Sequence, residues 1–388
     1  MILGFRFKLK PTAKQHAALA EALERSRLLY NAALEERIDC YRKTGKGRSY
    51  FDQCKALTEL RKDGARFSAV MERAPLKALD DAYKAFFARG GFPRFKGRDW
   101  YKSIGWPERN GWGIRRGRFI AKGLGAIRIH LHREMRGEMR SCNIKRQGRH
   151  WYLSVACEVE SSTTNEGAAV GIDMGIASLA ILSDGTRIEN PRLHRKALPS
   201  LRRAQRALAR CKRGSNRRRK VRERLARIHA RVRNQRSTYL HQVSAKIVKD
   251  HGIIAVEALR VKNMSRSARG TPAKPGTNVA AKAGLNRSIN DASWGRLKEL
   301  LRYKTTLNGG RLIEVNPSGT SQACSGCGVI VPKPLNVRWH ECPECGLSID
   351  RDHNAALNVL HRAVAGPGFD KPLVAAVRSR KISERNFS

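Results

Sequence analysis

Four of the nine cysteines in the chain form two Cys-x-x-Cys pairs. The pairs are Cys324–Cys327 and Cys342–Cys345, and 14 residues separate them. Four thiolates at this spacing can close a tetrahedral Zn²⁺ site, and the gap suits a zinc ribbon. A closed site of four cysteines leaves no coordination position for water or substrate, so we expect one structural zinc ion there. Four free thiols or an iron–sulfur cluster are the alternatives, although cluster spacings usually differ.

Three acidic residues stand where apolar segments end or a helix begins. Asp173 follows the apolar run 168–172, Glu257 ends the run 253–257, and Asp352 opens a helix. Carboxylates that converge from separate strands can hold hard cations such as Mg²⁺, and two such ions support phosphodiester hydrolysis. Each acid also has a simpler interpretation: a turn residue, a surface acid and a helix N-cap, respectively. Spacing alone does not show that the three meet.

The charge of the chain favours a polyanionic partner. Its 388 residues include 78 Lys+Arg and 33 Asp+Glu, a formal net charge of +45. Nucleic acid is the first candidate, because each neutralised phosphate releases counterions, and a membrane surface is the second. A small acidic metabolite does not need this much charge. Aromatic residues make up only 6% of the chain, which argues against a binder of single strands that works mainly by stacking.

The densest charge lies at 201–236, where 16 Lys/Arg accompany a single acid, Glu223. A solvated helix face is the alternative interpretation of such a run. We predict instead that the run binds nucleic acid, and its candidate contacts are Arg202, Arg203, Arg206, Arg210, Arg217, Arg218, Arg219, Lys220 and Arg224.

Composition also predicts the number of domains and the compartment. The length suggests two or three domains, and 41% hydrophobic residues can build a core. The five cysteines outside the two pairs do not resemble a disulfide framework, and no signal peptide or run of 18 uncharged apolar residues occurs. We therefore expect a cytoplasmic protein, in the bacterial cytosol and associated with the nucleoid.

Periodicity in the first part of the chain predicts a strand, then helices, then a sheet. The strand covers 3–10, and Thr12 with Gln15 forms a capping box for a helix that ends at 45–47. Further helices are expected at about 51–62 and 75–89. Residues 92–160 alternate like a small antiparallel sheet or barrel, and 161–166 fits a linker.

The second part of the chain predicts an α/β arrangement. Apolar strands at 168–172 and 177–182 precede a hairpin turn at Asp184-Gly185. Two basic helices follow, broken at 214–216, and then a strand at 253–257. A Gly/Pro-rich loop is expected at 265–286, a helix at 293–307, a strand at 311–315 and a final helix at 353–364.

Several motifs together resemble the TnpB family, transposon-encoded RNA-guided nucleases related to type V CRISPR effectors and to Fanzor proteins. The motifs are Lys10-Pro-Thr-Ala-Lys-Gln15, Tyr30-Asn31, Pro93-Arg-Phe-Lys-Gly97, Gly171-Ile-Asp-Met-Gly175, Val261-Lys-Asn-Met264, Thr320-Ser-Gln-Ala-Cys-Ser-Gly-Cys-Gly328, Cys342-Pro-Glu-Cys-Gly346 and Asp350-Arg-Asp-His-Asn-Ala-Ala356. Each is weak alone, but their order and spacing are specific, and they cover roughly residues 1–364.

The resemblance implies an α+β multidomain fold. Residues 1–10 and 92–160 would form a wedge-like oligonucleotide-binding barrel, with a helical recognition lobe at 11–91 inserted into it. Residues 167–320 and 348–365 would form an RNase H-like (RuvC) nuclease domain, and 321–347 a zinc ribbon that binds target nucleic acid. The tail 366–388 is expected to be disordered. The family's catalytic acids fall on Asp173, Glu257 and Asp352, with Asp352 preferred over Asp350.

The implied activity is RNA-guided cleavage of DNA beside a short adjacent motif, with two Mg²⁺ ions held by the three acids. The implied partners are a guide RNA encoded at the element end and a double-stranded DNA target; no membrane and no small-molecule substrate is expected. A catalytically silent RNA-guided repressor or transposition regulator is the main alternative. A transposase acting directly on transposon ends would need a nucleophilic Tyr with a His pair, and a zinc-ribbon RNA-binding protein would leave the three acids unexplained.

Overall fold

The computed structural model describes residues 1–160, 165, 167–334 and 336–365. Contacts divide the chain into two compact units, Met1–Glu160 and Ser161–Ser388. The predicted linker at 161–166 lies outside the described residues except for Asn165, and the predicted disordered tail at 366–388 lies wholly outside them.

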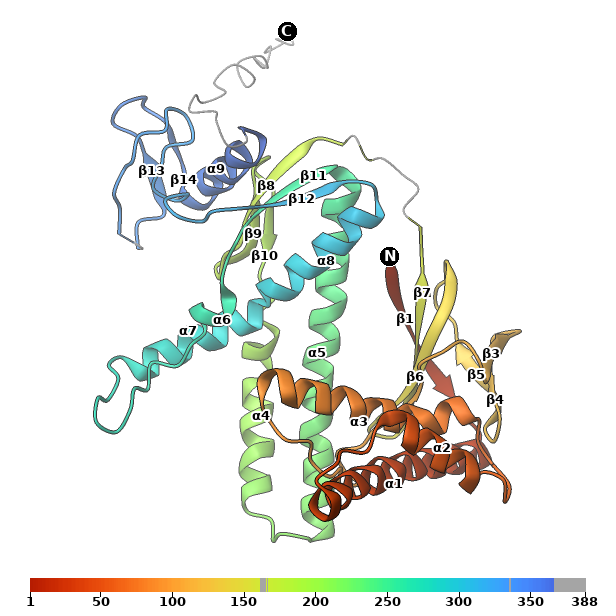
Figure 1. Ribbon diagram of the computed structural model, residues 1–388. Helices are drawn as coiled ribbons and strands as arrows, with labels where there is room; N and C mark the ends of the chain where they lie inside the picture. Colours follow the sequence, from red (N-terminus) through yellow and green to blue (C-terminus); the bar gives the residue numbers. More distant parts are fainter. Residues whose placement is uncertain (161–164, 166, 335, 366–388) are drawn as a thin grey trace. The chain divides into compact units, whose positions relative to one another are not determined.

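The first unit contains a seven-stranded antiparallel sheet (Figure 1). Its strands are β1 (Ile2–Lys10), β2 (Ser103–Trp106), β3 (Trp112–Arg115), β4 (Arg118–Ala121), β5 (Gly125–His130), β6 (Glu138–Gln147) and β7 (His150–Glu158). The strand order is β2-β6-β7-β1-β5-β4-β3, so β1 lies inside the sheet and pairs with both β7 and β5. Phe5, Phe7 and Leu9 alternate along β1 and are buried, which places them on the core face of the sheet.

Of the two forms that the alternation at 92–160 predicted, a sheet or a barrel, the hydrogen-bonded strands form an open sheet. Its edge strands, β2 and β3, do not pair with each other in the described part of the chain. The alternation at 92–160 therefore predicted the antiparallel strands, but not how the sheet ends. Closure depends on pairing between strands that are distant in sequence, which periodicity does not encode.

Three helices separate β1 from the other strands of this sheet. They are α1 (Ala13–Thr44), α2 (Tyr50–Leu60) and α3 (Ala69–Arg89). The predicted capping box at Thr12 and Gln15 is confirmed. Leu19 and Leu23 of α1 pack in the core of the sheet, whereas Leu34 packs with Leu57 of α2 in a second, helical core.

Helix α3 begins six residues earlier than the predicted start at 75. The hydroxyl of Ser68 accepts a hydrogen bond from the N–H of Met71 at 3.4 Å and another from the Trp106 indole at 3.1 Å. Pro75, at the predicted start, is buried inside the helix. Tertiary packing around Ser68 thus sets the helix start.

The second unit is built on a five-stranded mixed sheet. Its strands are β8 (Ala169–Asp173), β9 (Ser178–Leu182), β10 (Arg187–Glu189), β11 (Ile253–Glu257) and β12 (Arg311–Val315), in the order β10-β9-β8-β11-β12. Strands β10, β9 and β8 are antiparallel neighbours, and β8, β11 and β12 run parallel. The hairpin predicted at Asp184-Gly185 connects β9 and β10, and Asp184 accepts the N–H of Thr186 at 2.8 Å.

Among the described residues, six helices belong to the second unit. They are α4 (Leu193–Ala209), α5 (Asn216–Asp250), α6 (Val261–Met264), α7 (Val279–Ala292), α8 (Trp294–Leu307) and α9 (Arg351–Ala365). The predicted break at 214–216 is confirmed, and the Ser215 hydroxyl caps α5. The predicted loop at 265–286 is wrong from Val279 onward. Glycine and proline before that point are confined to 270–276, and the alanine-rich stretch that follows favours α7.

A small two-stranded sheet precedes α9. It consists of β13 (Trp339–Glu341) and β14 (Ser348–Asp350). These strands flank the second Cys-x-x-Cys pair and lead directly into α9. Across the residues that the structure describes, no helix is long and apolar enough to span a membrane.

Candidate metal centres

The structure brings the three predicted acids to one region of the second unit. Asp173 is the last residue of β8, Glu257 is the last residue of β11, and Asp352 lies in the first turn of α9. Ile172 pairs with Val256 in the parallel ladder, so the two strand-end acids follow paired residues. Carboxyl ends of neighbouring parallel strands meet at one sheet edge, which brings these two side chains together.

A glycine in β8 lets α9 approach the sheet. A side-chain carbon on Gly171 would overlap the carbonyl oxygen of Ala356 and would lie 2.6 Å from the amide nitrogen of Leu360. Only a residue without a Cβ therefore permits this contact. Since Asp173 is two residues beyond Gly171 and Asp352 is one turn before Ala356, the close approach also brings those acids near each other.

Asp350, not Asp352, caps helix α9. The Oδ1 atom of Asp350 accepts the N–H groups of Asp352 at 2.9 Å and His353 at 3.1 Å, and its other oxygen pairs with Arg187 at 3.1 Å. The capping role considered for Asp352 is therefore wrong, and Asp350 is already committed to other partners. Asp352 has a long contact to Arg338, at 3.7 Å.

The three carboxyl groups hold their protons more tightly than usual. Burial raises the pKa of Asp173 well above its ordinary value, and the charges of Glu257 and Asp352 raise it further. Burial also raises the pKa values of Glu257 and Asp352, the latter with a contribution from Asp350. Crowded carboxylates of this kind are stabilised by a positive charge placed among them.

Glu257 is buried and has a fixed partner. The hydroxyl of Thr320 donates to its Oε1 at 2.6 Å, and this hydrogen bond offsets part of the rise in the pKa of Glu257 that burial causes. The same hydroxyl lies 3.0 Å from the carbonyl oxygen of Pro317. This contact orients one carboxylate of the cluster.

The acidic cluster offers the donor set of a hard divalent cation. It supplies carboxylate oxygens, which suit Mg²⁺ better than softer metals. A divalent cation would also offset the mutual repulsion that raises the pKa of Asp173. The residues therefore fit Mg²⁺ in chemistry and in electrostatics.

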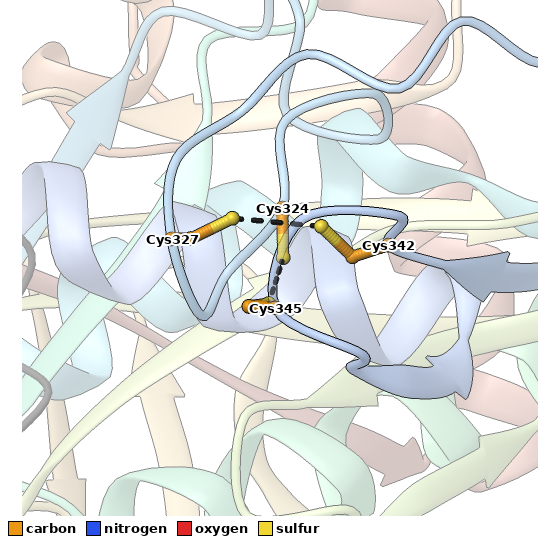
Figure 2. Close-up of side chains that lie close together, drawn as sticks. All are labelled: Cys324, Cys327, Cys342 and Cys345. Carbon is orange, nitrogen blue, oxygen red and sulfur yellow. Dashed lines mark hydrogen bonds between the residues drawn. The ribbon is translucent and has the colours of Figure 1, made fainter.

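The four predicted cysteines form a compact cluster (Figure 2). Their sulfur atoms lie within 4.8 Å of one another. The Cys324–Cys345 sulfurs are 3.6 Å apart and the Cys327–Cys342 sulfurs 3.5 Å apart. Tetrahedral Zn–S bonds of about 2.3 Å imply S···S separations of ~3.8 Å, so the cluster fits a zinc ion.

Local backbone structure favours the thiolate form of one of the four cysteines, Cys342. Each pair lies on a tight turn. The N–H of Gly328 donates to the carbonyl oxygen of Cys324, and the N–H of Gly346 donates to that of Cys342. The backbone N–H groups of Cys345 and Glu344 lower the pKa of Cys342 to about 7. Lowering a thiol pKa increases the fraction of thiolate, which is the form that binds metal.

The predicted nucleic-acid contacts lie on the antiparallel helices α4 and α5, except Arg210, which directly follows α4. Arg218 differs from the rest. Its guanidinium is partly buried and donates to the carbonyl oxygens of Leu208 at 3.0 Å and Cys211 at 3.1 Å. It therefore stabilises the turn between the helices. The other eight predicted contacts are exposed: Arg202, Arg203, Arg206, Arg210, Arg217, Arg219, Lys220 and Arg224.

A basic groove of about 620 Å³ lies between α4 and α5. Its cations are Lys196, Arg224, Arg227 and Arg231, and no acid lines it among the described residues. Of these, only Arg224 was predicted from sequence, although helical spacing places Arg224, Arg227 and Arg231 on one face of α5 and could have identified them.

Sequence reasoning also missed Thr320, Asn354 and Asn358, which contact the metal-centre segments. Their spacing does not resemble any ligand pattern. The motif that begins at Asp350 includes Asn354 and ends before Asn358. Nothing in this motif indicated what the two side-chain amides contact.

The fold and the site define an α+β protein with two compact units, a four-cysteine cluster that could hold a metal ion and three acids at the end of a sheet. Protein-family models match three stretches: "Probable transposase", OrfB_IS605, at residues 152–268; "Cas12f1-like, TNB domain" at 294–359; and "Helix-turn-helix domain" of OrfB_IS605 at 1–46. In the structure, 1–46 contains β1 and the single long helix α1.

Several relatives match nearly the whole chain, and two of them are more than 30% identical to it. InsQ of Escherichia coli (strain K12), named for RNA-guided DNA endonuclease activity, is 35% identical over 92% of this chain and 91% of its own. A Streptomyces pristinaespiralis protein with the same activity in its name is 33% identical, over 93% and 89%. A solved structure, "Structure of the mini-RNA-guided endonuclease CRISPR-Cas_phi3", aligns over 95% of this chain and 94% of its own at 10% identity and a TM-score of 0.45. The chain belongs to the OrfB/TnpB family.

Proposed function

We propose that this protein is an RNA-guided DNA endonuclease whose catalytic residues are Asp173, Glu257 and Asp352. The observation that carries the proposal is the convergence of these acids from β8, β11 and α9, where the charges of Glu257 and Asp352 raise the pKa of Asp173. The names of the Escherichia coli and Streptomyces pristinaespiralis relatives support the guided cleavage of DNA. The order of the five-stranded sheet, with antiparallel strands on one side and parallel strands on the other, supports an RNase H-like (RuvC) nuclease domain.

Each group of site residues has a separate role in the proposed reaction. The three carboxylates would hold two Mg²⁺ ions, which when bound would activate water and stabilise the leaving oxygen of the phosphodiester. The Thr320 hydroxyl orients Glu257, and Asp350 fixes the first turn of α9 so that Asp352 stays available. The four cysteines would hold one structural zinc ion. The proposed partners are a guide RNA and double-stranded DNA, in a bacterial cytosol.

The domain boundaries from the sequence remain part of this proposal. The wedge comprises 1–10 and 92–160, the recognition lobe 11–91, the nuclease domain 167–320 and 348–365, and the zinc ribbon 321–347. In the sequence, α1 to α3 lie between β1 and the other strands of the first sheet, and this order supports an inserted helical lobe.

The first experiment identifies the guide. The gene is expressed with its downstream flank, the protein is purified, and the bound RNA is sequenced. We expect one dominant RNA with a constant scaffold and a 3′ end that extends past the element boundary. A broad mixture of host RNA that follows abundance would contradict a dedicated guide.

The second experiment tests cleavage with the purified complex. The substrate is a plasmid library that carries the guide-matched sequence beside randomised bases. Asp173→Ala should abolish Mg²⁺-dependent cleavage and leave RNA and DNA binding intact. Glu299→Ala is the matched control, because Glu299 is an exposed acid whose pair with Arg296 at 2.9 Å lies on the surface of α8. If the wild-type complex binds the matched DNA and leaves it uncut, the protein is a guided repressor instead.

A further inference from the structure

Two buried asparagines of α9 hold the segment that leads into the cysteine cluster. This segment is 320–325, which we call the bridging segment. The Asn358 amide donates to the carbonyl oxygens of Thr320 at 2.8 Å and Ala323 at 2.7 Å. Asn354 donates to Ala323 at 2.8 Å and accepts the N–H of Ser325 at 2.9 Å.

The bridging segment touches both candidate metal centres. At its beginning, the Thr320 hydroxyl donates to the buried carboxylate of Glu257 at 2.6 Å. Near its end, Cys324 contributes a sulfur to the cysteine cluster. A short stretch of backbone therefore connects a ligand of one centre to the hydroxyl that orients a ligand of the other.

Helix α9 completes the connection. Asn354 and Asn358 are one turn apart and share a face of the helix, and their side chains hold the bridging segment. Asp352 lies in the first turn of the same helix. Two acids of the proposed active site are thus positioned by groups that also fix the cysteine loop.

We propose that occupation of the cysteine cluster positions Glu257 and Asp352 through the bridging segment, with Thr320, Asn354 and Asn358 as the positioning residues. This inference rests on the proposed function for its biological meaning. The physical reason is that a metal held by Cys324 restrains the segment, and the two asparagines and Thr320 transfer that restraint to the acids. Groups that orient metal ligands in this way commonly change metal affinity by about 10- to 100-fold when they are removed.

The test measures Mn²⁺ binding at the acidic cluster in the full-length protein without RNA or DNA, by EPR titration. Asp173→Ala identifies the part of the binding that belongs to this site. Zinc content is measured in parallel by elemental analysis, and thermal unfolding reports on the fold. None of these readouts requires cleavage.

Three variants separate positioning from folding. Thr320→Val removes the hydroxyl at nearly constant shape, Thr320→Ser restores it, and Asn358→Leu removes both amide donors. Asn308→Ala is the matched control, because the Asn308 amide also donates to a backbone carbonyl, that of Val248 at 3.1 Å, in another part of the unit.

We expect Thr320→Val to keep one zinc per chain and to weaken Mn²⁺ binding about tenfold or more. The Mn²⁺ affinities of Thr320→Ser and Asn308→Ala should stay within about twofold of the wild-type affinity. Removal of zinc from the wild type with a thiol-reactive mercurial should weaken Mn²⁺ binding, and should do so less in Thr320→Val, where the connection is already broken.

Three results would overturn the inference. They are unchanged Mn²⁺ affinity in Thr320→Val with zinc in place, unchanged affinity after zinc removal from the wild type, and the absence of any Mn²⁺ binding that depends on Asp173. Failure of the proposed function is a separate outcome: a protein that shows the coupling but never cuts guide-matched DNA would keep the inference and lose the guided cleavage.

Discussion

Lys304 shows how a single side chain can report on the packing of the second unit. Its ammonium group donates to the carbonyl oxygen of His241 at 2.6 Å and to the Ser244 hydroxyl at 2.8 Å, between α8 and α5. Partial burial lowers the pKa of Lys304 to about 8. The folded protein therefore binds this proton less tightly than the unfolded chain does.

The sign of the pH dependence follows from that difference. An ordinary lysine has a pKa of about 10.4, so between about pH 8 and pH 10.4 the unfolded chain carries more of this proton. The contribution of Lys304 to the free energy of unfolding must then rise with pH across this window and be constant below it. We expect the melting temperature of the wild type, relative to Lys304→Met, to increase from about pH 8 to pH 10.

Lys249→Met is the matched control, because Lys249 is exposed near the end of α5. The comparison of variants removes the general effect of pH on a highly cationic protein. A difference between wild type and Lys304→Met that stays flat across the same pH window would contradict the burial of this charge.

Single residues also show what the sequence could reveal about the site. The cysteine spacing predicted a compact four-sulfur cluster, because both pairs lie on short turns whose geometry is local. Thr320 could not be assigned in this way. Its partner, Glu257, is 63 residues away, and a threonine before a cysteine pair has no property that distinguishes an orienting hydroxyl from a surface one.

At the scale of elements, the contact between β8 and α9 decides whether the acidic cluster can form. A methyl group on Gly171 would meet backbone atoms of α9, which cannot rotate away as a side chain can. We expect Gly171→Ala to lower the free energy of unfolding by about 1–3 kcal/mol or more, as overpacking does, and to abolish cleavage. Urea unfolding and the plasmid assay measure the two effects.

Gly295→Ala provides the control for that substitution. Gly295 lies in α8, and nothing lies within 4 Å of an added Cβ. Alanine is the better helix former, so the control should be neutral or more stable by up to about 1 kcal/mol. Equal behaviour of the two variants would show that α9 does not pack this closely on β8.

The elements that were predicted correctly and incorrectly differ in what determines their limits. The start of α1 depends on Thr12 and Gln15, three residues apart, and the break before α5 depends on local turn residues. The start of α3 depends instead on Ser68, whose hydroxyl contacts Trp106 from a distant strand. The pattern of α7 was hidden because a Gly/Pro-rich stretch directly precedes it.

At the scale of the whole molecule, the net charge of +45 predicts nucleic-acid binding without saying where the nucleic acid lies. The groove between α4 and α5 provides a location. Its arginines on one face of α5 have no acidic neighbours among the described residues of the lining, so a phosphate backbone would meet unopposed positive charge there.

We therefore expect the position of these charges to matter more than their number. The groove variant changes Arg224, Arg227 and Arg231 to Gln. The control changes Lys212, Arg213 and Arg233 to Gln; these three residues are exposed, lie outside the groove lining and are not among the nine predicted contacts. For single-stranded RNA, loss of three phosphate contacts should reduce the slope of log K against log salt by about 2. The control should change that slope by less than about 1.

The measurement is the affinity for the co-purified RNA at several salt concentrations. Both variants lose the same formal charge, so a general electrostatic effect alters them equally. Equal losses of affinity and slope in the two variants would contradict a binding site in the groove.

The place of β1 inside the first sheet governs how this unit can form on the ribosome. Ile2 pairs with Glu158, so β1 has no partner in β7 until that distant strand has been synthesised. At about 5–20 residues per second, the wait is roughly 8–30 s. Helices α1 to α3 emerge during this interval and can pack on one another, while the part of β1 that pairs only with β7 remains unpaired. A chain arrested before His150 cannot complete the sheet, and its first strand would be a target for chaperones.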